Sequence, residues 1–190
     1  MFDLDTLFAD CRTAVADADP RGAIREVLIR TVAKPDDVAA ALAKDEGGIN
    51  VLYNAEDLTI LNVIWAPNMS LPPHDHRMWA AIGIYGGAEA NTLYRRGEER
   101  LQPAGGRTLD VSDVFSLGQD AIHSVENPRT VFTGAIHIYG GDFVNQPRSM
   151  WDPDTLLEGT YDVEDVRQRF AQANEDWRRQ LGTDLDESND

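Results

Sequence analysis

The segment Leu71-Pro72-Pro73-His74-Asp75-His76 places two histidines two residues apart, directly after a pair of prolines. The prolines hold the backbone extended just before the histidines. In a β-strand, residues two apart point to the same face of the sheet, so both imidazoles are expected on one face. Two imidazoles on one face form half of a metal site. The apolar run 79–85 that follows is expected to continue as a strand.

The two remaining histidines of the chain also lie in segments with strand character. His123 lies in a predicted strand and begins a His-x3-Asn pattern that ends at Asn127. Further on, His137 and Tyr139 are two residues apart and therefore share one face of another predicted strand. Taken singly, each histidine has a simpler explanation, as a solvent-facing residue or as a buried ring bonded to the backbone. Taken together, the downstream segments strengthen the interpretation of the histidine pair as part of a metal site.

Hydrophobic periodicity divides the chain into a helical first part, a β-rich middle and a helical end. Helices are expected over residues 4–15, from about 24 to 32, from 35 to 44 and from 163 to 181. Strands are expected at residues 58–65, 79–85, 91–95, 107–111, 114–117, 121–125 and 131–139. Closely spaced strands without intervening helices are typical of a small barrel or sandwich.

A chain of 190 residues is long enough for one well-formed core. We therefore expect a single domain over residues 1–190, in which a helical cap (1–48) precedes a barrel (49–145). The remainder (146–190) is expected to hold an extended segment, the last helix and an acidic tail. The tail itself, residues 184–190, is expected to be frayed and solvated.

The composition excludes several classes of function. A formal net charge of −16 argues against binding nucleic acid or anionic membranes, which needs concentrated positive charge. Cys11 is the only cysteine, so an intrachain disulfide and a cysteine-based zinc site are excluded. The sequence contains no signal segment and no apolar run of bilayer length, so the expected location is the cytoplasm. The oligomeric state stays open, a homo-oligomer included.

A His-x-His pair followed downstream by His-x3-Asn resembles the two motifs of the cupin superfamily. This resemblance implies a mainly β fold, the double-stranded β-helix (jelly-roll) barrel, here with N-terminal helices and a C-terminal helix. Cupins hold a metal inside this barrel. The first cupin motif usually contains a glutamate as well, and the corresponding positions of this chain are Ala80 and Ala81.

A three-histidine cupin with a downstream His-x-Tyr resembles the thiol dioxygenases, the group of cysteine dioxygenase and 3-mercaptopropionate dioxygenase. The resemblance implies that His74, His76 and His123 bind Fe(II), and that the enzyme adds O2 to the sulfur of a small carboxylate-bearing thiol to give a sulfinate. Three neutral imidazoles leave the iron its full double charge and three open positions, where thiolate and oxygen can meet. The expected partners are therefore a small-molecule thiol and O2.

The same resemblance assigns catalytic roles to His137 and Tyr139, as a hydrogen-bonding pair beside the open positions. Tyr139 would donate to oxygen or substrate, and His137 would orient its hydroxyl. The serine that the family carries two residues before this histidine is Ala135 here. The cysteine that is crosslinked to the tyrosine in the animal enzymes would fall at Ala81, so no crosslink can form.

Two arginines are candidates for binding the carboxylate of the substrate. Residues 48–52, where the animal enzyme has its arginine on an early strand, contain none. Arg148 follows His137 at the spacing of the 3-mercaptopropionate type, and arginine grips a carboxylate through two parallel hydrogen bonds. Arg77, next to the histidine pair, is the competing candidate, although strand alternation turns it away from the metal. Arg148 could instead cap a helix or pair with a nearby aspartate.

Alternative functions stay open at this point. A cupin with the same metal could act on a non-thiol substrate as a carbon-oxidising dioxygenase, an isomerase or a lyase, because the fold does not decide the reaction. A binding or storage cupin could use the metal for structure or for sensing a ligand. Glu89 could serve as a displaced carboxylate ligand, although a glutamate just after the turn residues Gly86-Gly87 is usually solvated.

Overall fold

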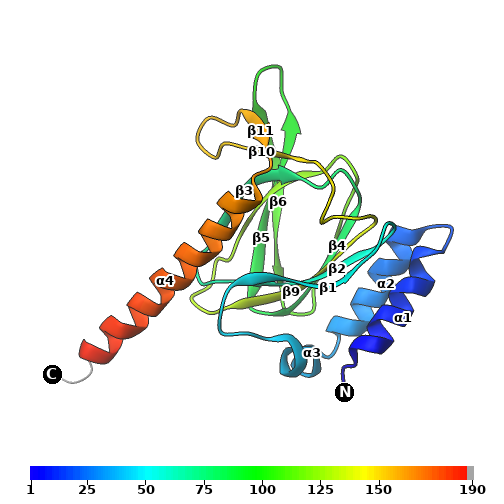
Figure 1. Ribbon diagram of the computed structural model, residues 1–190, viewed down its shortest axis with the longest axis horizontal. Helices are drawn as coiled ribbons and strands as arrows, with labels where there is room; N and C mark the ends of the chain where they lie inside the picture. Colours follow the sequence, from blue (N-terminus) through cyan, green and yellow to red (C-terminus); the bar gives the residue numbers. More distant parts are fainter. Residues whose placement is uncertain (188–190) are drawn as a thin grey trace.

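The computed structural model describes residues 1–187, with side chains described as far as Gly182. Two antiparallel sheets form the body of the molecule, with helices on its outside (Figure 1). The helices are α1 (Leu4–Val15), α2 (Pro20–Val32), α3 (Pro35–Leu42) and α4 (Val163–Glu187). The strands are β1 (Gly48–Asn54), β2 (Thr59–Trp65), β3 (Ser70–Asp75), β4 (Ala80–Gly86), β5 (Ala88–Arg96), β6 (Leu101–Asp110), β7 (Val114–Leu117), β8 (Ile122–Glu126), β9 (Thr133–Tyr139), β10 (Ser149–Trp151) and β11 (Glu158–Thr160).

The order of the strands identifies the barrel. One sheet has the order β1-β2-β9-β4-β7 and the other has the order β11-β10-β3-β8-β5-β6. Between β2 and β9 the chain passes back and forth from one sheet to the other, apart from the hairpin β5-β6. Two facing sheets, β2-β9-β4-β7 and β3-β8-β5-β6, connected in this way form an eight-stranded jelly roll. The fold is therefore the expected cupin double-stranded β-helix, mainly β, with helices at both ends.

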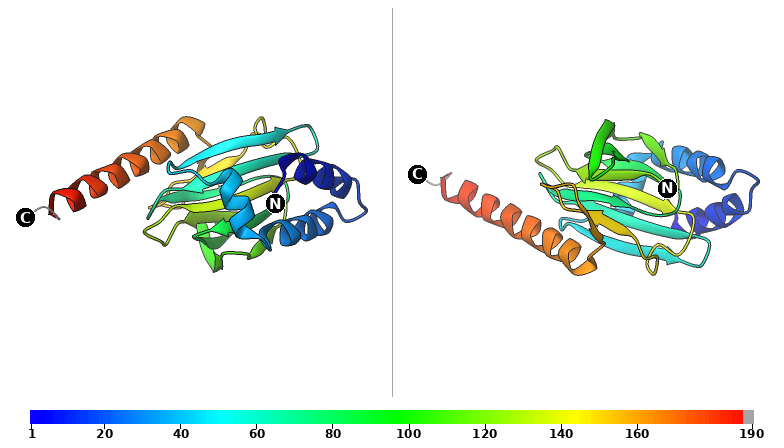
Figure 2. Two further views of the ribbon diagram at one scale, coloured as in Figure 1. Left: turned by 90° about the horizontal axis from the view of Figure 1, so that it is seen from below. Right: turned by 90° about the horizontal axis from the view of Figure 1, so that it is seen from above.

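The outer face of the β1-β2-β9-β4-β7 sheet is covered by α1, α2 and α3 (Figures 1 and 2). Successive strand residues point to opposite faces, so Ile60 of β2 and Ile136 and Ile138 of β9 face these helices. They pack in one apolar cluster with helix residues such as Cys11 and Leu28, and all five side chains are fully buried. This apolar layer holds the sheet whose other face lines the barrel interior.

The predicted N-terminal helices are confirmed, and local chemistry explains where they begin. The Asp3 carboxylate accepts a hydrogen bond from the Thr6 backbone N–H at 2.8 Å and caps α1. Pro20 begins α2, several residues before the apolar periodicity becomes visible in the sequence. Proline is favoured at the first helical position because its missing N–H would have no partner there. Its neighbour Asp19 supplies the cap.

The first half of α4 is anchored to the barrel. Phe170 is buried, and its ring stacks on that of Trp65 at a centroid distance of 5.5 Å. The Asn174 side chain accepts a hydrogen bond from the Gly47 N–H at 2.7 Å and donates one to the Gly47 carbonyl at 3.0 Å. Trp177 meets the Phe132 ring edge-on at a centroid distance of 5.8 Å, and Arg178 lies 2.9 Å from the Glu46 carboxylate. The end of the helix points away from the barrel (Figures 1 and 2).

The expected end of α4 at residue 181 is wrong, because the helix continues to Glu187. Residues 184–187 of the acidic tail are therefore helical rather than frayed, since adding residues to an existing helix costs little once it is nucleated. Residues 188–190, the rest of the tail, lie outside the described part of the chain. Within the described part, no helix combines the length and the apolar character that crossing a membrane requires.

Most predicted strands are confirmed within a few residues, but β1, β10 and β11 have no counterpart among them. β10 and β11 have three residues each, too few to show a period of two. β1 is an exposed edge strand whose residues do not alternate cleanly between buried and exposed. β6 begins at Leu101 and not at the predicted residue 107. The sequence prediction missed the first part of this strand because Pro103 and Gly105-Gly106 are typical of a turn.

Candidate metal centre

The three histidines of the two sequence motifs converge inside the barrel. His74 lies in β3, His76 follows β3 directly, and His123 lies opposite His74 on the paired strand β8. Nε2 of His76 is 3.3 Å from Nε2 of His74 and 3.1 Å from Nε2 of His123. All three side chains are buried, and their ligand atoms lie within 4.8 Å of one another. The structure therefore brings together the residues predicted as metal ligands.

The two prolines orient the first of these rings. The register between β3 and β8 shifts between Leu71 and His74, across Pro72 and Pro73. Proline has no N–H to donate to the ladder, so it is tolerated at such irregular positions. The Pro72 carbonyl accepts a hydrogen bond from His74 Nδ1 at 3.0 Å. The proline pair that predicts an extended backbone therefore also supplies the carbonyl that orients the His74 ring.

The hydrogen bonds at Nδ1 decide which ring atoms face the centre. His123 Nδ1 donates to the Asn91 side-chain oxygen at 2.7 Å, as His74 Nδ1 does to Pro72. Carbonyl oxygens only accept, so both Nδ1 atoms carry the hydrogen and both Nε2 atoms present a lone pair. His76 Nδ1 is buried without a hydrogen-bond partner among the described residues. The Nε2 atoms of His74 and His123 therefore present lone pairs to the centre, and Nε2 of His76 lies within 3.3 Å of both as the third potential ligand atom.

Burial keeps the three imidazoles neutral. It lowers the pKa of His74 to about 4 and holds the pKa values of His76 and His123 well below the usual value. The neutral ring is the form of imidazole that binds metals. The donor set thus fits a divalent transition-metal ion, and three nitrogen ligands without a carboxylate suit iron, nickel or zinc.

Glu89 is part of the barrel interior, which corrects the expectation of a solvated turn residue. It is completely buried in β5, where its Oε2 accepts hydrogen bonds from Trp65 Nε1 at 2.7 Å and from His137 Nε2 at 3.1 Å. Asn91 Nδ2 donates to Oε1 at 3.0 Å. Burial alone would raise the pKa of Glu89, but His137 and these hydrogen bonds outweigh it and lower the pKa. Glu89 is therefore a buried carboxylate, and it stands outside the cluster of candidate ligands.

Asn91 is the residue that sequence reasoning missed. It lies two positions after Glu89 on β5, so both side chains point into the barrel. One end of its amide accepts from the ligand candidate His123, and the other end donates to Glu89. The only sequence signal is the alternation Glu-x-Asn. The strand is predicted only from residue 91, because the glycines before Glu89 indicate a turn.

His137 and Tyr139 share the inner face of β9 and line the same cavity as the three histidines. His137 Nε2 donates to the Glu89 carboxylate at 3.1 Å, and a hydrogen bond of 3.2 Å joins His137 Nδ1 to the Tyr139 hydroxyl. The Tyr139 ring stacks on Phe143 and meets the edge of His76 at a centroid distance of 5.0 Å. Burial raises the pKa of Tyr139, so its hydroxyl stays protonated.

Arg148 is half-buried and is held by aromatic rings rather than by an acid. Its guanidinium carbon lies 3.9 Å from the Phe143 ring centre and 4.0 Å from that of Tyr161. Nη1 donates to the carbonyls of Phe143 and Gln146, whereas Nε is buried without a partner. Among the residues that the structure describes, no carboxylate forms an ion pair with Arg148. The aspartate pairing considered from the sequence is thus not observed.

Arg77 points out of the barrel, as strand alternation predicts. Its Nη2 donates to the Ser149 hydroxyl at 2.9 Å, and its Nε lies 3.5 Å from the Asp75 carboxylate. Asp75 is buried and also accepts from the Ser149 N–H, which ties β3 to β10. The structure therefore does not bring Arg77 to the three histidines, and its contacts are those of a strand-joining residue.

The three histidines border a narrow cavity of about 20 Å³. Two polar residues, His137 and Tyr139, form part of its walls. The other wall residues are mostly apolar: Ile49, Leu61, Val63, Trp65, Leu71, Val125, Phe143 and Tyr161. Since a cavity of roughly 10–15 Å³ holds one water molecule, only a few atoms of a ligand fit beside the histidines.

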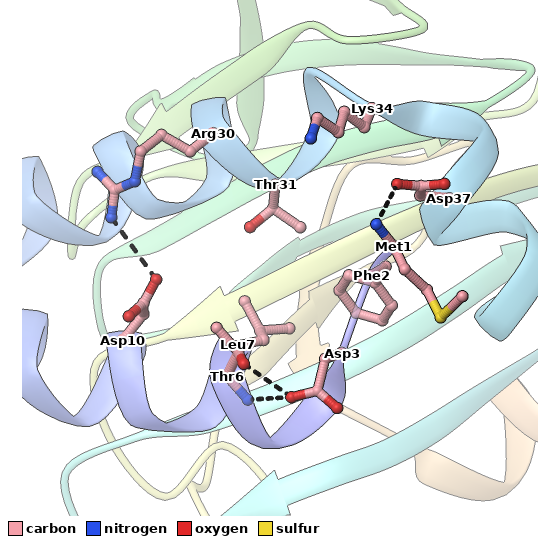
Figure 3. A pocket seen from close by; sticks show the side chains of 10 residues that line it. All are labelled: Met1, Phe2, Asp3, Thr6, Leu7, Asp10, Arg30, Thr31, Lys34 and Asp37. Carbon is pink, nitrogen blue, oxygen red and sulfur yellow. Dashed lines mark hydrogen bonds and ion pairs between the residues drawn. The ribbon is translucent and has the colours of Figure 1, made fainter.

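A second hollow, of about 220 Å³, lies between α1, α2 and α3 (Figure 3). Two ion pairs lie in it: the Met1 amine is 3.0 Å from the Asp37 carboxylate, and Arg30 is 3.8 Å from Asp10. No histidine lines it. This hollow therefore lacks the chemistry of the barrel cavity.

Comparison with known proteins gives similarity to cupin structures. No protein-family model matches the chain. One similar structure is an RmlC-like cupin family protein with a double-stranded β-helix fold from Methanocaldococcus jannaschii, at 11% identity over 54% of this chain and 86% of that chain, with a TM-score of 0.45. Another is an uncharacterized conserved protein with a double-stranded β-helix domain from Klebsiella pneumoniae, at 12% identity over 60% and 86%, with a TM-score of 0.46. A third is a cupin domain from Bordetella pertussis, at 16% identity over 53% and 98%, with a TM-score of 0.39.

The strand order and the buried histidines together define the class of protein. The chain has a cupin fold, and three histidines in its barrel are placed so that they could hold a metal ion. Such a site is compatible with an enzyme.

Proposed function

We propose that the protein is a non-haem Fe(II) dioxygenase that adds both atoms of O2 to the sulfur of a small carboxylate-bearing thiol. The observation that carries this proposal is the cluster of three neutral, buried histidines with the Tyr139 ring against His76. In the overall reaction, a thiol and O2 give a sulfinic acid. The sulfur is oxidised by four electrons, O2 is reduced, and both oxygen atoms remain in the product, so no further reductant is needed.

Nε2 of His74, His76 and His123 would hold the iron. When bound, Fe(II) with three neutral ligands supplies a doubly charged centre at which a thiolate and O2 can meet. The remaining steps concern what the chain itself contributes. The apolar walls Leu61, Val63 and others exclude bulk water from the cavity, which strengthens every polar interaction inside it.

Tyr139 is suited to donate a hydrogen bond to the reacting oxygen or sulfur. Its raised pKa keeps the hydroxyl protonated, and the Tyr139 ring meets the His76 ring edge-on. His137 orients this hydroxyl, and the buried Glu89 carboxylate fixes His137 in turn. Because Asn91 joins Glu89 to His123, one hydrogen-bonded chain connects a metal ligand to the catalytic tyrosine. Glu89 on β5 thus orients His137, in place of the serine that the family carries at the position of Ala135.

Arg148 is suited to bind the substrate carboxylate. Its Nε is buried without a partner, and no acid neutralises its charge among the described residues. A carboxylate could accept two parallel hydrogen bonds from the edge of the guanidinium that carries Nε. The rings of Phe143 and Tyr161 hold the guanidinium plane, and both rings also line the cavity of the histidines. Arg148 therefore stands between that cavity and the outside.

The proposal is tested by oxygen uptake of protein loaded anaerobically with one Fe(II) per chain. 3-Mercaptopropionate, cysteine, cysteamine and mercaptosuccinate are offered separately, and products are identified by mass spectrometry. We expect uptake with a carboxylate-bearing thiol, with both added oxygen atoms derived from ¹⁸O2. Cysteamine, which has no carboxylate, should react poorly. The absence of uptake with every thiol, despite bound iron, would contradict the proposal and favour chemistry on a non-thiol substrate.

A further inference from the structure

An outer pocket adjoins the cavity of the three histidines. It has a volume of about 400 Å³ and lies between β1 and the anchored half of α4. Ile49, Leu61, Phe143 and Tyr161 line both spaces, so these four side chains form the wall between them. A ligand that reaches the histidines from this side must pass that wall.

Exposed apolar side chains gather around the outer pocket. Nine large hydrophobic side chains of the described residues are exposed. Four of the nine line this one pocket, namely Ile49 (39% exposed), Val51 (53%), Val144 (50%) and Val163 (50%). Isolated exposed valines need no explanation, whereas a cluster of them around a hollow marks a surface that binds an apolar group.

The pocket also has one uncompensated positive charge, at its inner end. Arg148 lines the outer pocket and contacts the dividing rings Phe143 and Tyr161, and its Nε lacks a partner. The other charged side chains of the pocket are engaged elsewhere: Glu46 binds Arg178 at 2.9 Å, and Arg167 lies 3.6 Å from Glu164. The chemistry of the lining therefore combines an apolar surface with a single anion-binding group.

The far wall of the pocket is preformed. Asn174 is fixed to both backbone polar groups of Gly47, and Phe170 is stacked on Trp65. Both contacts tie α4 to the barrel along the pocket, so a ligand does not have to order this wall when it binds. Preorganisation of this kind reduces the entropic cost of binding.

We propose that the outer pocket binds the hydrocarbon part of an anionic ligand whose carboxylate contacts Arg148. This inference rests on the proposed function for the identity of the reacting group. On that basis, the substrate is a mercapto acid that carries an apolar substituent next to its carboxylate. The thiol enters the small cavity, which admits only a few atoms, and the substituent occupies the outer pocket. An apolar cavity of about 150 Å³ accepts a benzene ring, so the outer pocket is large enough for a ring or a short alkyl chain.

Binding of alkanoates tests the pocket without thiol chemistry. Acetate, butyrate, hexanoate and octanoate are titrated into the full chain, loaded with one Fe(II) and kept anaerobic, by isothermal calorimetry. Each methylene buried against apolar surface strengthens binding by about fourfold. We expect octanoate to bind at least roughly tenfold more tightly than butyrate. Arg148→Gln should weaken octanoate binding while preserving the dependence on chain length.

A matched pair of valines provides the control. Val51→Asp places a charge in the pocket, whereas Val131→Asp changes a valine of nearly equal exposure (55%) that does not line it. Octanoate affinity should fall at least roughly tenfold in the first variant and stay within about twofold in the second. Equal affinity for all alkanoates, or equal loss in both variants, would overturn the inference. Sedimentation provides a further check. If the wild type forms a dimer that Val51→Asp dissociates and octanoate does not, the exposed patch binds a second copy of the chain, and the inference is overturned.

The outcome separates the pocket from the reaction. 3-Mercaptopropionate and 2-benzyl-3-mercaptopropionate are compared as substrates in the oxygen-uptake assay, and we expect a KM at least roughly tenfold lower for the benzyl compound. If 3-mercaptopropionate is oxidised but neither the benzyl group nor alkanoate length matters, the dioxygenase stands and the pocket inference fails. If alkanoates bind with the expected chain-length dependence but no thiol consumes oxygen, the pocket stands and the proposed reaction fails.

Discussion

The two faces of β9 carry equally buried residues with opposite roles. Ile136 and Ile138 point to the helices, and His137 and Tyr139 point into the barrel, and each is at most 3% exposed. The outward face meets only an apolar layer, whereas the inward face joins a hydrogen-bonded chain that includes Glu89. Burial therefore does not separate a structural core from a site. The distinction lies in buried polar groups that have specific partners and in ligand atoms that point at one another.

The largest effect is expected when a candidate metal ligand inside the barrel is removed. His76→Ala removes the Nε2 that lies within 3.3 Å of both neighbouring Nε2 atoms. Affinity for Fe(II) should fall by more than about 100-fold, because even loss of an outer partner of a ligand costs 10–100-fold. Anaerobic equilibrium dialysis with metal analysis measures this, and circular dichroism should show an unchanged fold.

Arg77→Ala is the matched control for this variant, since Arg77 is the next residue in the chain but contacts Asp75 and Ser149 outside the barrel. It should retain one Fe(II) per chain. Equal metal loss in both variants would mean that the loop after β3, and not the His76 ring, controls binding.

The next largest effect is expected in the apolar layer between β9 and the N-terminal helices. Ile138→Ala leaves a cavity in the fully buried layer beneath the helices. We expect a loss of about 2–5 kcal/mol in the free energy of unfolding, measured by urea denaturation, because the neighbouring side chains fill such a cavity only partly. Fe(II) affinity of the folded variant should stay within about twofold. A metal affinity that fell in proportion to stability would show that the two faces are not independent.

A smaller effect is expected at Asn91, which sharpens the comparison because it is inward-facing but touches no metal. Asn91→Ala removes the acceptor for His123 Nδ1 and should lower Fe(II) affinity by about 10–100-fold, by releasing the ring orientation. Its exposed neighbour Thr92 points away from the barrel, so Thr92→Ala serves as the control and should leave the affinity unchanged. Wild-type Fe(II) affinity in Asn91→Ala would mean that the hydrogen bond from His123 to Asn91 does not contribute to metal binding.

The smallest effect concerns Cys11 in the helical layer. Burial raises the pKa of its thiol to about 12, so almost no thiolate exists at pH 8 in the folded protein. Modification by a disulfide reagent at that pH should be close to zero over minutes and should become complete in denaturant. Because Cys11 reports on the outer layer alone, His76→Ala should label as slowly as the wild type, whereas Ile138→Ala should label faster. Rapid labelling of the wild type would contradict the dry packing of this layer.

The sequence predicts the inward residues that belong to motifs and misses those that do not. His74, His76 and His123 could be assigned because proline lead-in, strand spacing and motif pattern agree. Glu89 was expected to be solvated because the glycines before it signal a turn, and a single sequence does not indicate that β5 resumes at once. Only pairing with β8 places Glu89 and its neighbour Asn91 inside the barrel.

The outer pocket lies further beyond the reach of sequence reasoning. Its walls come from β1, which was not predicted as a strand, and from α4, more than a hundred residues later. The exposed Val51 and Val163 carry no local pattern, so only the docking of α4 through Asn174 brings them to one hollow. Long-range packing of this kind creates sites that periodicity and spacing do not encode.

The most direct test of the central claim is X-ray absorption spectroscopy at the iron edge, on wild-type protein loaded anaerobically with one Fe(II) per chain. We expect the outer-shell scattering of three imidazole rings, reduced to two in His76→Ala reconstituted at high iron, and a new sulfur scatterer when a mercapto acid is added. A first shell of oxygen without imidazole scattering, or one containing a carboxylate from Glu89, would contradict the three-histidine centre on which the account depends.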